Sequence, residues 1–333
     1  MGRQSYNILK FRAISLFSGG LDSILAVKIM MGMGIEIEGI VFETPFFSAQ
    51  KARMAAKIIG LPLRVFDIAD AHLLMLKAPR YGYGKNMNPC IDCHTLMLKS
   101  AGAKMEEANA NFLFTGEVLG QRPMSQTRQS LYLVAKNSGY DDVILRPLSA
   151  RLLAETKPER EGVVDRTKLF AIQGRGRKTQ MELARHYGIV DYAPPAGGCL
   201  LTDPNFSRRL RDLFDHQPDC RIRDIELLKF GRHFRIKEDC KVIVGRNQID
   251  NEAIQCLISE NDATLQMADA PGPIILVPGS GDYQALSTAA ALCVLYSGVP
   301  PEQTRRIVCR DSRRDLFVSA KAISRQDAER MLL

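Results

Sequence analysis

The chain has 333 residues, of which 46% are hydrophobic and 25% charged, with a formal net charge of +8. This length suits two or three domains with their own cores, and the composition is that of an ordinary globular protein. No apolar stretch approaches the roughly 20 residues of a membrane helix, and no signal-peptide pattern follows the N-terminus. We therefore expect a cytoplasmic protein without a membrane segment. The basic excess suits a polyanionic partner, although an incidentally basic protein explains the charge alone equally well.

Cysteine usage argues against a secreted, disulfide-stabilised protein. The eight cysteines are spread over a long chain that shows no secretory signal. Cys256 and Cys293 lie in apolar helical patterns and are expected to fill the core.

A glycine turn near the N-terminus is the strongest motif of the chain. The apolar run from Ile14 to Phe17 predicts a strand, Ser18-Gly-Gly-Leu-Asp-Ser23 follows it, and a helical pattern begins at Ile24. Backbone N–H groups and a helix N-terminus converge on an anion in this geometry. Gly19 and Gly20 permit the tight turn and the approach of a phosphate, and Ser18 and Ser23 add hydroxyl donors. The lysine of a Walker loop is missing. An ordinary turn that caps a helix is the alternative.

Strands and helices alternate after this turn. The pattern predicts further strands at 35–42, 63–68, 112–114 and 144–145, with helices at 25–32 and 49–59. Such alternation is typical of an α/β fold with a doubly wound parallel sheet, in which ligands bind beyond the carboxyl ends of the strands. The glycine turn is expected at such an end.

A CxxC motif, Asn88-Pro-Cys90-Ile-Asp-Cys93-His94, precedes a helix predicted at 95–108. The helix dipole favours the thiolate form of cysteines near its N-terminus. The pair fits a redox dithiol, half of a zinc site or part of an iron–sulfur site, and the spacing does not choose among them. His94 is expected to be structural or solvated.

Three later segments also carry functional residues. Gly116 and Gly120 let the stretch from Thr115 to Gln126 approach a ligand, and Glu117, Gln121, Ser125 and Gln126 can orient nucleotide or tRNA groups. Arg175, Arg177 and Lys178 make the run 174–178 suitable for contacts with RNA phosphates, although a solvated surface loop is the alternative. Cys199 ends a stretch of prolines and glycines from Ala193, which indicates a functional thiol.

These motifs together resemble the PP-loop tRNA thiolation enzymes, a branch of the ATP pyrophosphatases that includes 4-thiouridine synthases and tRNA 2-thiouridylases. The resemblance covers about residues 12–210 and rests on SGGLDS, the CxxC pair, TGEVLGQRPMSQ, Arg146-Pro-Leu148 and Cys199. It implies ATP-dependent adenylation of a uracil carbonyl of tRNA, assisted by Mg²⁺, followed by sulfur transfer. The sulfur donor would be inorganic sulfide or a cysteine desulfurase. The implied ATP-binding residues are Ser18, Gly19, Gly20, Asp22, Ser23, Gly116 and Gln121, and Asp22 is the expected acidic residue near phosphates or metal.

The same resemblance implies a role for three cysteines. Some members of this group work through a persulfide, whereas others hold a 4Fe–4S cluster by a CxxC pair and one distant cysteine. Cys90, Cys93 and Cys199 match the second pattern, so they are expected to be catalytic and to bind such a cluster.

The C-terminal part has a different order of elements. Residues 211–228 look like a helical connector between a domain at 1–210 and an α+β domain at 229–333. Strands are predicted at 231–236, 241–247, 274–277, 307–310 and 316–319, with helices at 251–260 and 283–296. The sequence VGRN, the turn at 269–273 and Tyr296-Ser297 resemble the NFACT RNA-binding domain. Arg232 and Arg246 are candidate RNA contacts. An RNA-binding protein with an inactive PP-loop and a small-molecule ligase or amidase are the alternative functions.

Overall fold

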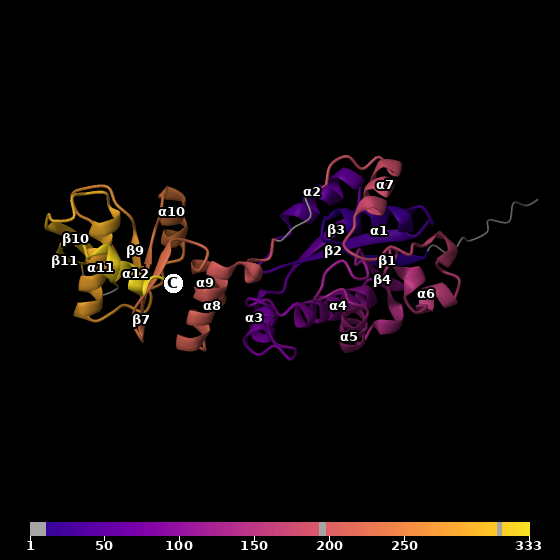
Figure 1. The fold of residues 1–333 in the computed structure, drawn as a ribbon, viewed down its shortest axis with the longest axis horizontal. Helices are drawn as coiled ribbons and strands as arrows, with labels where there is room; N and C mark the ends of the chain where they lie inside the picture. The colour runs from indigo at the N-terminus through magenta and orange to yellow at the C-terminus, as the bar shows by residue number, and fades with distance from the viewer. Residues whose placement is uncertain (1–10, 193–197, 312–314) are drawn as a thin grey trace, which may run out of the picture. The chain divides into compact units, whose positions relative to one another are not determined.

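The computed structural model describes residues 11–192, 198–311 and 315–333 of the chain (Figure 1). The chain divides into two compact units, Met1–Leu200 and Leu201–Leu333. Within the described ranges, no helix combines the length and the apolar composition that crossing a bilayer requires.

The first unit is built on a parallel sheet of five strands. Their order is β3-β2-β1-β4-β5, and each neighbouring pair is parallel. The strands are β1 (Arg12–Leu16), β2 (Glu36–Glu43), β3 (Leu63–Asp67), β4 (Phe112–Thr115) and β5 (Ile144–Leu145). This order confirms the predicted doubly wound α/β fold.

Helices cover both faces of this sheet (Figure 1). On one face, α1 (Leu21–Met31), α2 (Gln50–Ile59) and α7 (Lys178–His186) share a core with strand residues such as Ala13. On the other face, α4 (Cys90–Glu107) and α5 (Arg128–Ser138) pack on neighbouring residues such as Ile14. Because adjacent side chains enter opposite cores, these strands read as continuous apolar runs. The unit also contains α3 (Ala69–Lys77) and the short α6 (Lys157–Arg160).

Two helices of the first unit begin earlier than the sequence pattern predicts, and both shifts affect the motifs. Helix α1 begins at Leu21, because Gly20 has the extended conformation of an N-cap residue. Asp22 is therefore in the first helical turn rather than before it. Helix α4 begins at Cys90, so the CxxC motif forms its first turn. The apolar pattern did not predict these first helical turns because they contain motif residues instead of a run of core residues.

The second unit is built on a largely antiparallel sheet of six strands, which confirms the predicted α+β fold. The strand order is β11-β10-β8-β9-β7-β6. The strands are β6 (Arg232–Lys237), β7 (Cys240–Val244), β8 (Ala263–Met267), β9 (Ile275–Val277), β10 (Arg305–Arg310) and β11 (Asp315–Ala320). The helices are α8 (Pro204–His216), α9 (Ile222–Leu227), α10 (Gln248–Cys256), α11 (Tyr283–Tyr296) and α12 (Arg325–Met331). Strand β8 and helix α12 were not predicted, because both are short and α12 buries only Ala328.

The two faces of this second sheet are covered differently. Helix α11 packs on one face, where it shares a core with alternate residues of the strands. On the opposite face, Leu227 of α9 and Ile254 of α10 cover Ile243 and Leu276 of β7 and β9. The outward side chains of β8, β10 and β11 do not enter either core.

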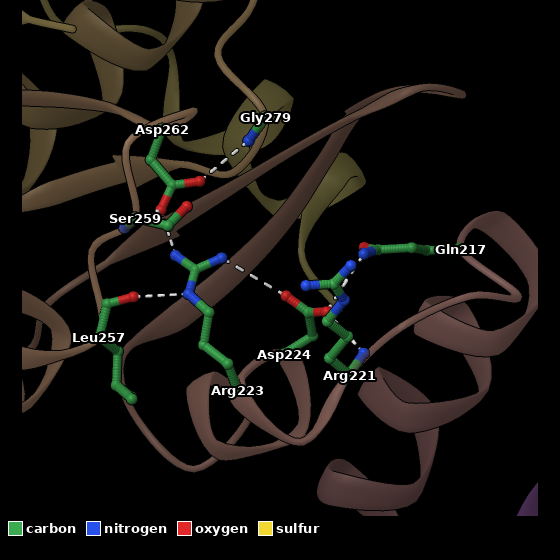
Figure 2. Close-up of polar contacts among 8 residues, drawn as sticks. All are labelled: Gln217, Arg221, Arg223, Asp224, Leu257, Ser259, Asp262 and Gly279. Carbon is green, nitrogen blue, oxygen red and sulfur yellow. Dashed lines mark hydrogen bonds and ion pairs between the residues drawn. The ribbon is translucent and has the colours of Figure 1, made fainter. Parts of the chain in front are cut away.

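Residues 211–228 are integrated into the second unit rather than forming a separate connector. Figure 2 shows Arg223 of α9, whose Nε donates to the carbonyl of Leu257 at 2.6 Å and whose guanidinium pairs with buried Asp262. Asp262 also accepts hydrogen bonds from the amides of Ser259 at 2.9 Å and Gly279 at 3.0 Å. Helix α9 is thereby fixed to the loop before β8 and, through Asp262, to the loop after β9.

Helix α8 is anchored to the same unit through a buried carboxylate. Asp212 accepts from Nη2 of Arg235 at 2.7 Å, and its Oδ2 lies 3.3 Å from Nζ of Lys241. Burial lowers the pKa of Lys241 to about 8, although Asp212 acts in the opposite direction. Removing one partner of such a buried group leaves an uncompensated charge, which costs much more than the pair gains.

Asp212→Ala should therefore destabilise β6 and β7. We expect the opening free energy of their amides to fall by about 3 kcal/mol, because Arg235 and Lys241 lose their counter-charge. Hydrogen exchange of the full chain, resolved by mass spectrometry, measures this free energy. The control is Asp315→Ala, which removes an exposed partner of Arg310 and should cost under about 1 kcal/mol. Equal effects of both changes would contradict the anchoring role of Asp212.

Candidate active site

The glycine turn after β1 has a fixed conformation. Gly19 has a φ of +74°, and a Cβ on it would lie 2.5 Å from the carbonyl oxygen of Lys51 in α2. The hydroxyl of Ser23 donates to the carbonyl of Gly20 at 2.8 Å and receives a bond from Ser18 at 3.3 Å. Only glycine fits the backbone at Gly19, and the turn presents its amides beside the N-terminus of α1.

The loop after β4 packs directly against this turn. A Cβ on Gly116 would lie 2.4 Å from the backbone nitrogen of Ser23, so the two segments touch through their main chains. The strand order reverses between β1 and β4, and crevices at such switch points are the usual ligand sites of doubly wound sheets. The predicted ligand residues of both loops are therefore brought together.

A chain of side chains links the turn, this loop and α7. Nε2 of Gln121 donates to Oδ2 of Asp22 at 2.7 Å, and Nε2 of Gln180 donates to Oε1 of Gln121 at 3.0 Å. The other carboxylate oxygen of Asp22 is buried, and it has no hydrogen-bond partner among the described residues. An anionic oxygen in this state is suited to a hard cation such as Mg²⁺. Gln180 is buried and was not predicted.

The basic run 174–178 is attached to the same loop. Leu119 and Gln173 form a parallel bridge, and the amide of Gly174 donates to the carbonyl of Leu119 at 2.7 Å. The candidate RNA contacts Arg175, Arg177 and Lys178 follow this bridge. They are therefore held beside the loop after β4 rather than on a remote surface.

The CxxC cysteines are held by side chains of two other segments. Nδ2 of Asn88 donates to Sγ of Cys90 at 3.2 Å, and Sγ of Cys93 lies 3.4 Å from Nε2 of His72 in α3. His72 is fully buried, and this burial lowers its pKa to about 4, so the ring is neutral at pH 7. Burial, and then the neighbouring thiols of Cys199 and Cys90, raise the pKa of Cys93.

Cys199 is brought to the CxxC pair through the loop after β2. The amide of the next residue, Leu200, donates to the carbonyl of Phe46 at 3.0 Å, and the ring of Phe46 lies 5.3 Å from that of His72. A Cβ on the preceding Gly198 would lie 3.7 Å from Nζ of Lys51, beside the glycine turn. The preceding proline–glycine residues 193–197 lie outside the described residues.

The three predicted cysteines therefore lie in one neighbourhood. All three are half-buried, and Cys93 interacts electrostatically with both of the others. In the part of the chain that the structure describes, no three Cys, His, Asp or Glu side chains already adopt a metal-binding arrangement. Thiolates are nevertheless the usual ligands of iron–sulfur clusters, and this neighbourhood offers three of the four that such a cluster usually has.

A buried ionic network connects the cysteine helix with the end of β4. Glu117 accepts hydrogen bonds from Thr115 at 3.1 Å and from Nε of Arg146 at 3.0 Å, and it lies 3.0 Å from Nδ1 of His94. Burial by itself would raise the pKa of Glu117, but Arg146 and His94 outweigh it and lower the pKa to about 2. Glu117 thus supports the site from inside instead of facing a ligand, and His94 has the structural contact expected of it.

The candidate residues of the second unit have defined partners. The guanidinium of Arg246 pairs with Asp250, with Nε 2.5 Å from Oδ2. The guanidinium of Arg232 lies 4.7 Å from the ring centre of Tyr296. Both remain predictions as RNA contacts.

Sequence reasoning missed His72, Lys51 and Gln180. His72 lies 21 residues before Cys93, without motif spacing, and its only sequence signal is a histidine within an apolar helical run. Lys51 and Gln180 sit on helices whose positions at the site follow from the fold alone.

Comparison with known proteins agrees with this architecture. Residues 10–152 match the family model of the thiamine biosynthesis protein (ThiI). Residues 231–331, in the second unit, match the model of the NFACT protein RNA binding domain.

The curated relatives described next match about two fifths of this chain. The probable tRNA sulfurtransferase of Caldanaerobacter subterraneus is 30% identical over 141 residues, which cover 41% of this chain and 36% of the relative. The probable tRNA sulfurtransferase of Bacillus licheniformis is 31% identical over 148 residues, covering 41% and 34%. The chain thus spans about a third of the length of the curated relatives that it matches.

Two solved structures are similar to parts of the chain. A 4-thiouridine synthetase–RNA complex with bound ATP is 21% identical, with a TM-score of 0.39, over 65% of this chain and 52% of the other. A predicted subunit of tRNA methyltransferase from Methanocaldococcus jannaschii is 18% identical, with a TM-score of 0.33, over 53% and 74%.

The Glu117 network makes the free energy of unfolding depend on pH. The folded-state pKa of about 2 is lower than the ordinary 4.5, so Glu117 stabilises the fold above pH 4.5 and loses this effect as pH falls toward 2. The full effect corresponds to about 3 kcal/mol at 1.36 kcal/mol per pKa unit. The unfolding free energies of the wild type and Glu117→Gln in urea should therefore differ most at pH 7 and converge only as the pH falls to about 2.

The control for this experiment is Glu107→Gln. Glu107 is an exposed partner of Lys104, so the change should alter the unfolding free energy by under about 1 kcal/mol throughout the range. A difference between wild type and Glu117→Gln that does not vary with pH would contradict the assigned network.

Proposed function

We propose that this protein is an ATP-dependent tRNA uridine thiolase, which adenylates a uracil carbonyl oxygen and replaces it by sulfur. The observation that supports the proposal is the common location of the glycine turn after β1 and three half-buried cysteines beside one parallel sheet. The turn would activate an oxygen as a leaving group, and the cysteines would deliver the sulfur. The similarity of the ThiI-family region to probable tRNA sulfurtransferases supports this assignment.

Adenylation is assigned to the turn and the loop after β4. The amides and hydroxyls of Ser18, Gly19, Gly20 and Ser23 would bind ATP phosphates and stabilise the departing pyrophosphate. The free carboxylate oxygen of Asp22 would hold Mg²⁺, with its second oxygen positioned by Gln121. Gly116 keeps room for this arrangement because a side chain there would collide with Ser23.

Sulfur transfer is assigned to Cys90, Cys93 and Cys199. As three neighbouring thiols they fit a 4Fe–4S cluster, which would supply an open iron position for sulfide and act as a Lewis acid. Asn88 and His72 hold two of the thiols, and the Leu200–Phe46 hydrogen bond positions the third. The sulfur donor would be inorganic sulfide or a cysteine desulfurase.

The charge distribution supports tRNA as the partner and indicates which unit attracts it. Residues 1–200 contain 26 Lys and Arg against 18 Asp and Glu, so they carry the whole net charge of +8. Residues 201–333 contain 19 of each kind and are neutral. Arg175, Arg177 and Lys178, held beside the nucleotide loop, would bind RNA phosphates close to the reaction centre. Such an enzyme would work in the cytoplasm.

Gly116→Ala should abolish adenylation. The new methyl group collides with the backbone of Ser23, so the turn or the loop has to move, and a shift of about 1 Å can cost about 100-fold in rate. ATP–pyrophosphate exchange in the presence of tRNA measures this step. The control is Gly176→Ala, because a Cβ there has nothing within 4 Å. An unchanged rate of ATP–pyrophosphate exchange in Gly116→Ala would contradict the assignment of the turn to the ATP site.

Cys199→Ala should separate the two half-reactions. We expect thiolated uridine to disappear from tRNA incubated with ATP and sulfide, as measured by nucleoside mass spectrometry, whereas ATP–pyrophosphate exchange persists. Anaerobically purified Cys199→Ala should also hold less iron than the wild type. Cys256→Ala, which changes an exposed cysteine of the second unit, is the control and should retain both activities. Wild-type thiolation by Cys199→Ala would refute the three-cysteine site, and a wild type without thiolation would refute the proposed function.

A further inference from the structure

Among the described residues of the second unit, no helix covers half of one face of the sheet. The core residues Ala263, Leu265, Ile307, Cys309 and Val318 point toward α11. Alternate residues of β8, β10 and β11 point the other way, where α9 and α10 cover only β7 and β9. Among these outward residues, the exposed ones are Gln266, Arg306, Arg310, Asp315, Phe317 and Ser319.

An arginine stacked on an aromatic ring lies on this face. Phe317 is 58% exposed, which is unusual for a large apolar side chain on a strand. The guanidinium of Arg306 lies 3.6 Å from the centre of its ring. The strand register places Val308 opposite Phe317, and Arg306 opposite Ser319. The small side chain of Ser319 leaves the stack open beside Arg306.

Several other arginines around this sheet are engaged by carboxylates. Arg223 pairs with Asp262, Arg235 with Asp212, and Arg246 with Asp250. Arg310 pairs with Asp315 on the face itself. Arg306, like Arg232, lies against an aromatic ring instead, and the unit as a whole is neutral. Such a surface is poorly suited to the dense charge of a duplex backbone but well suited to an unpaired base.

We propose that the face formed by Gln266, Arg306, Val308 and Phe317 stacks an unpaired nucleobase of the RNA substrate. Bases of single-stranded RNA stack on aromatic rings and on guanidinium planes, and each such contact has a substantial effect on affinity. A base placed on the Arg306–Phe317 pair extends an existing stack, while Gln266 provides hydrogen-bonding groups beside it. The identity of the RNA as tRNA rests on the proposed function.

This assignment divides RNA binding between two kinds of interaction. The basic first unit would supply the salt-dependent attraction to phosphates, and the neutral second unit would add stacking that salt hardly affects. The two contributions can be measured separately, because salt titration reports the number of phosphate contacts.

A tryptophan introduced in place of Phe317 tests the contact directly. The chain contains no Trp, so Phe317→Trp introduces a single fluorophore into the full-length protein. We expect an unmodified tRNA transcript and a short single-stranded oligouridine to quench its fluorescence by stacking. The control is Tyr283→Trp, because Tyr283 is 80% exposed on α11, which covers the opposite face. Absence of quenching in Phe317→Trp, or equal quenching in both variants, would overturn the proposal.

Affinity measurements provide the second test. Phe317→Ala should weaken binding of the tRNA transcript by about tenfold without changing the slope of affinity against salt. Tyr283→Ala should bind like the wild type, and equal melting temperatures exclude misfolding. Unchanged affinity in Phe317→Ala overturns the proposal. It is also overturned if the wild type is a dimer without RNA and Phe317→Ala is a monomer, because the face would then bind a second copy of the chain.

Failure of the stacking proposal can be distinguished from failure of the proposed function. If the thiolase assignment is correct, Phe317→Ala should retain the thiolation rate at saturating tRNA and show only a raised KM. If the wild type does not thiolate tRNA but RNA quenches the fluorescence of Phe317→Trp, the stacking face stands and the thiolase assignment fails.

Discussion

The first unit depends on one close contact between two backbones. Gly116, at the end of β4, lies against the amide of Ser23 so closely that a single methyl group cannot be inserted. This contact brings together the loops of the two strands between which the strand order reverses. The positions of Asp22 and Gln121, and through Gln121 that of α7, follow from it. The basic run is held at the same place by its pairing with Leu119.

The CxxC cysteines are connected to this contact through Glu117 and His94. Glu117 follows Gly116 directly, and its buried carboxylate holds His94, the neighbour of Cys93. A shift of the loop after β4 is therefore transmitted to both the phosphate turn and the cysteine helix. Because Arg146 balances the buried charge, this connection lasts through the whole neutral pH range.

Much of this arrangement follows from the sequence. Glycines, cysteines and acidic residues at fixed spacing identify the turn and the CxxC pair, and strand alternation places both at the same edge of the sheet. The starts of α1 and α4 were predicted too late, because their first turns serve the site and break the apolar pattern. His72 and Gln180 could not be predicted, because their distances along the chain from Cys93 and Gln121 carry no motif. Residues 211–228 were read as a connector, since their contacts with Leu257 and β6 are long-range.

The Asp22–Gln121–Gln180 chain also constrains how the protein is made. Its two hydrogen bonds span 99 and 59 residues of sequence. During synthesis, the turn leaves the ribosome long before α7 does, and Cys199 follows later still. The surroundings of the glycine turn and the cysteine neighbourhood are consequently completed only when nearly the whole first unit has emerged. Nascent chains of this protein would carry the CxxC thiols without the third cysteine for most of that time, so the proposed nucleotide binding and sulfur chemistry would belong to the finished domain.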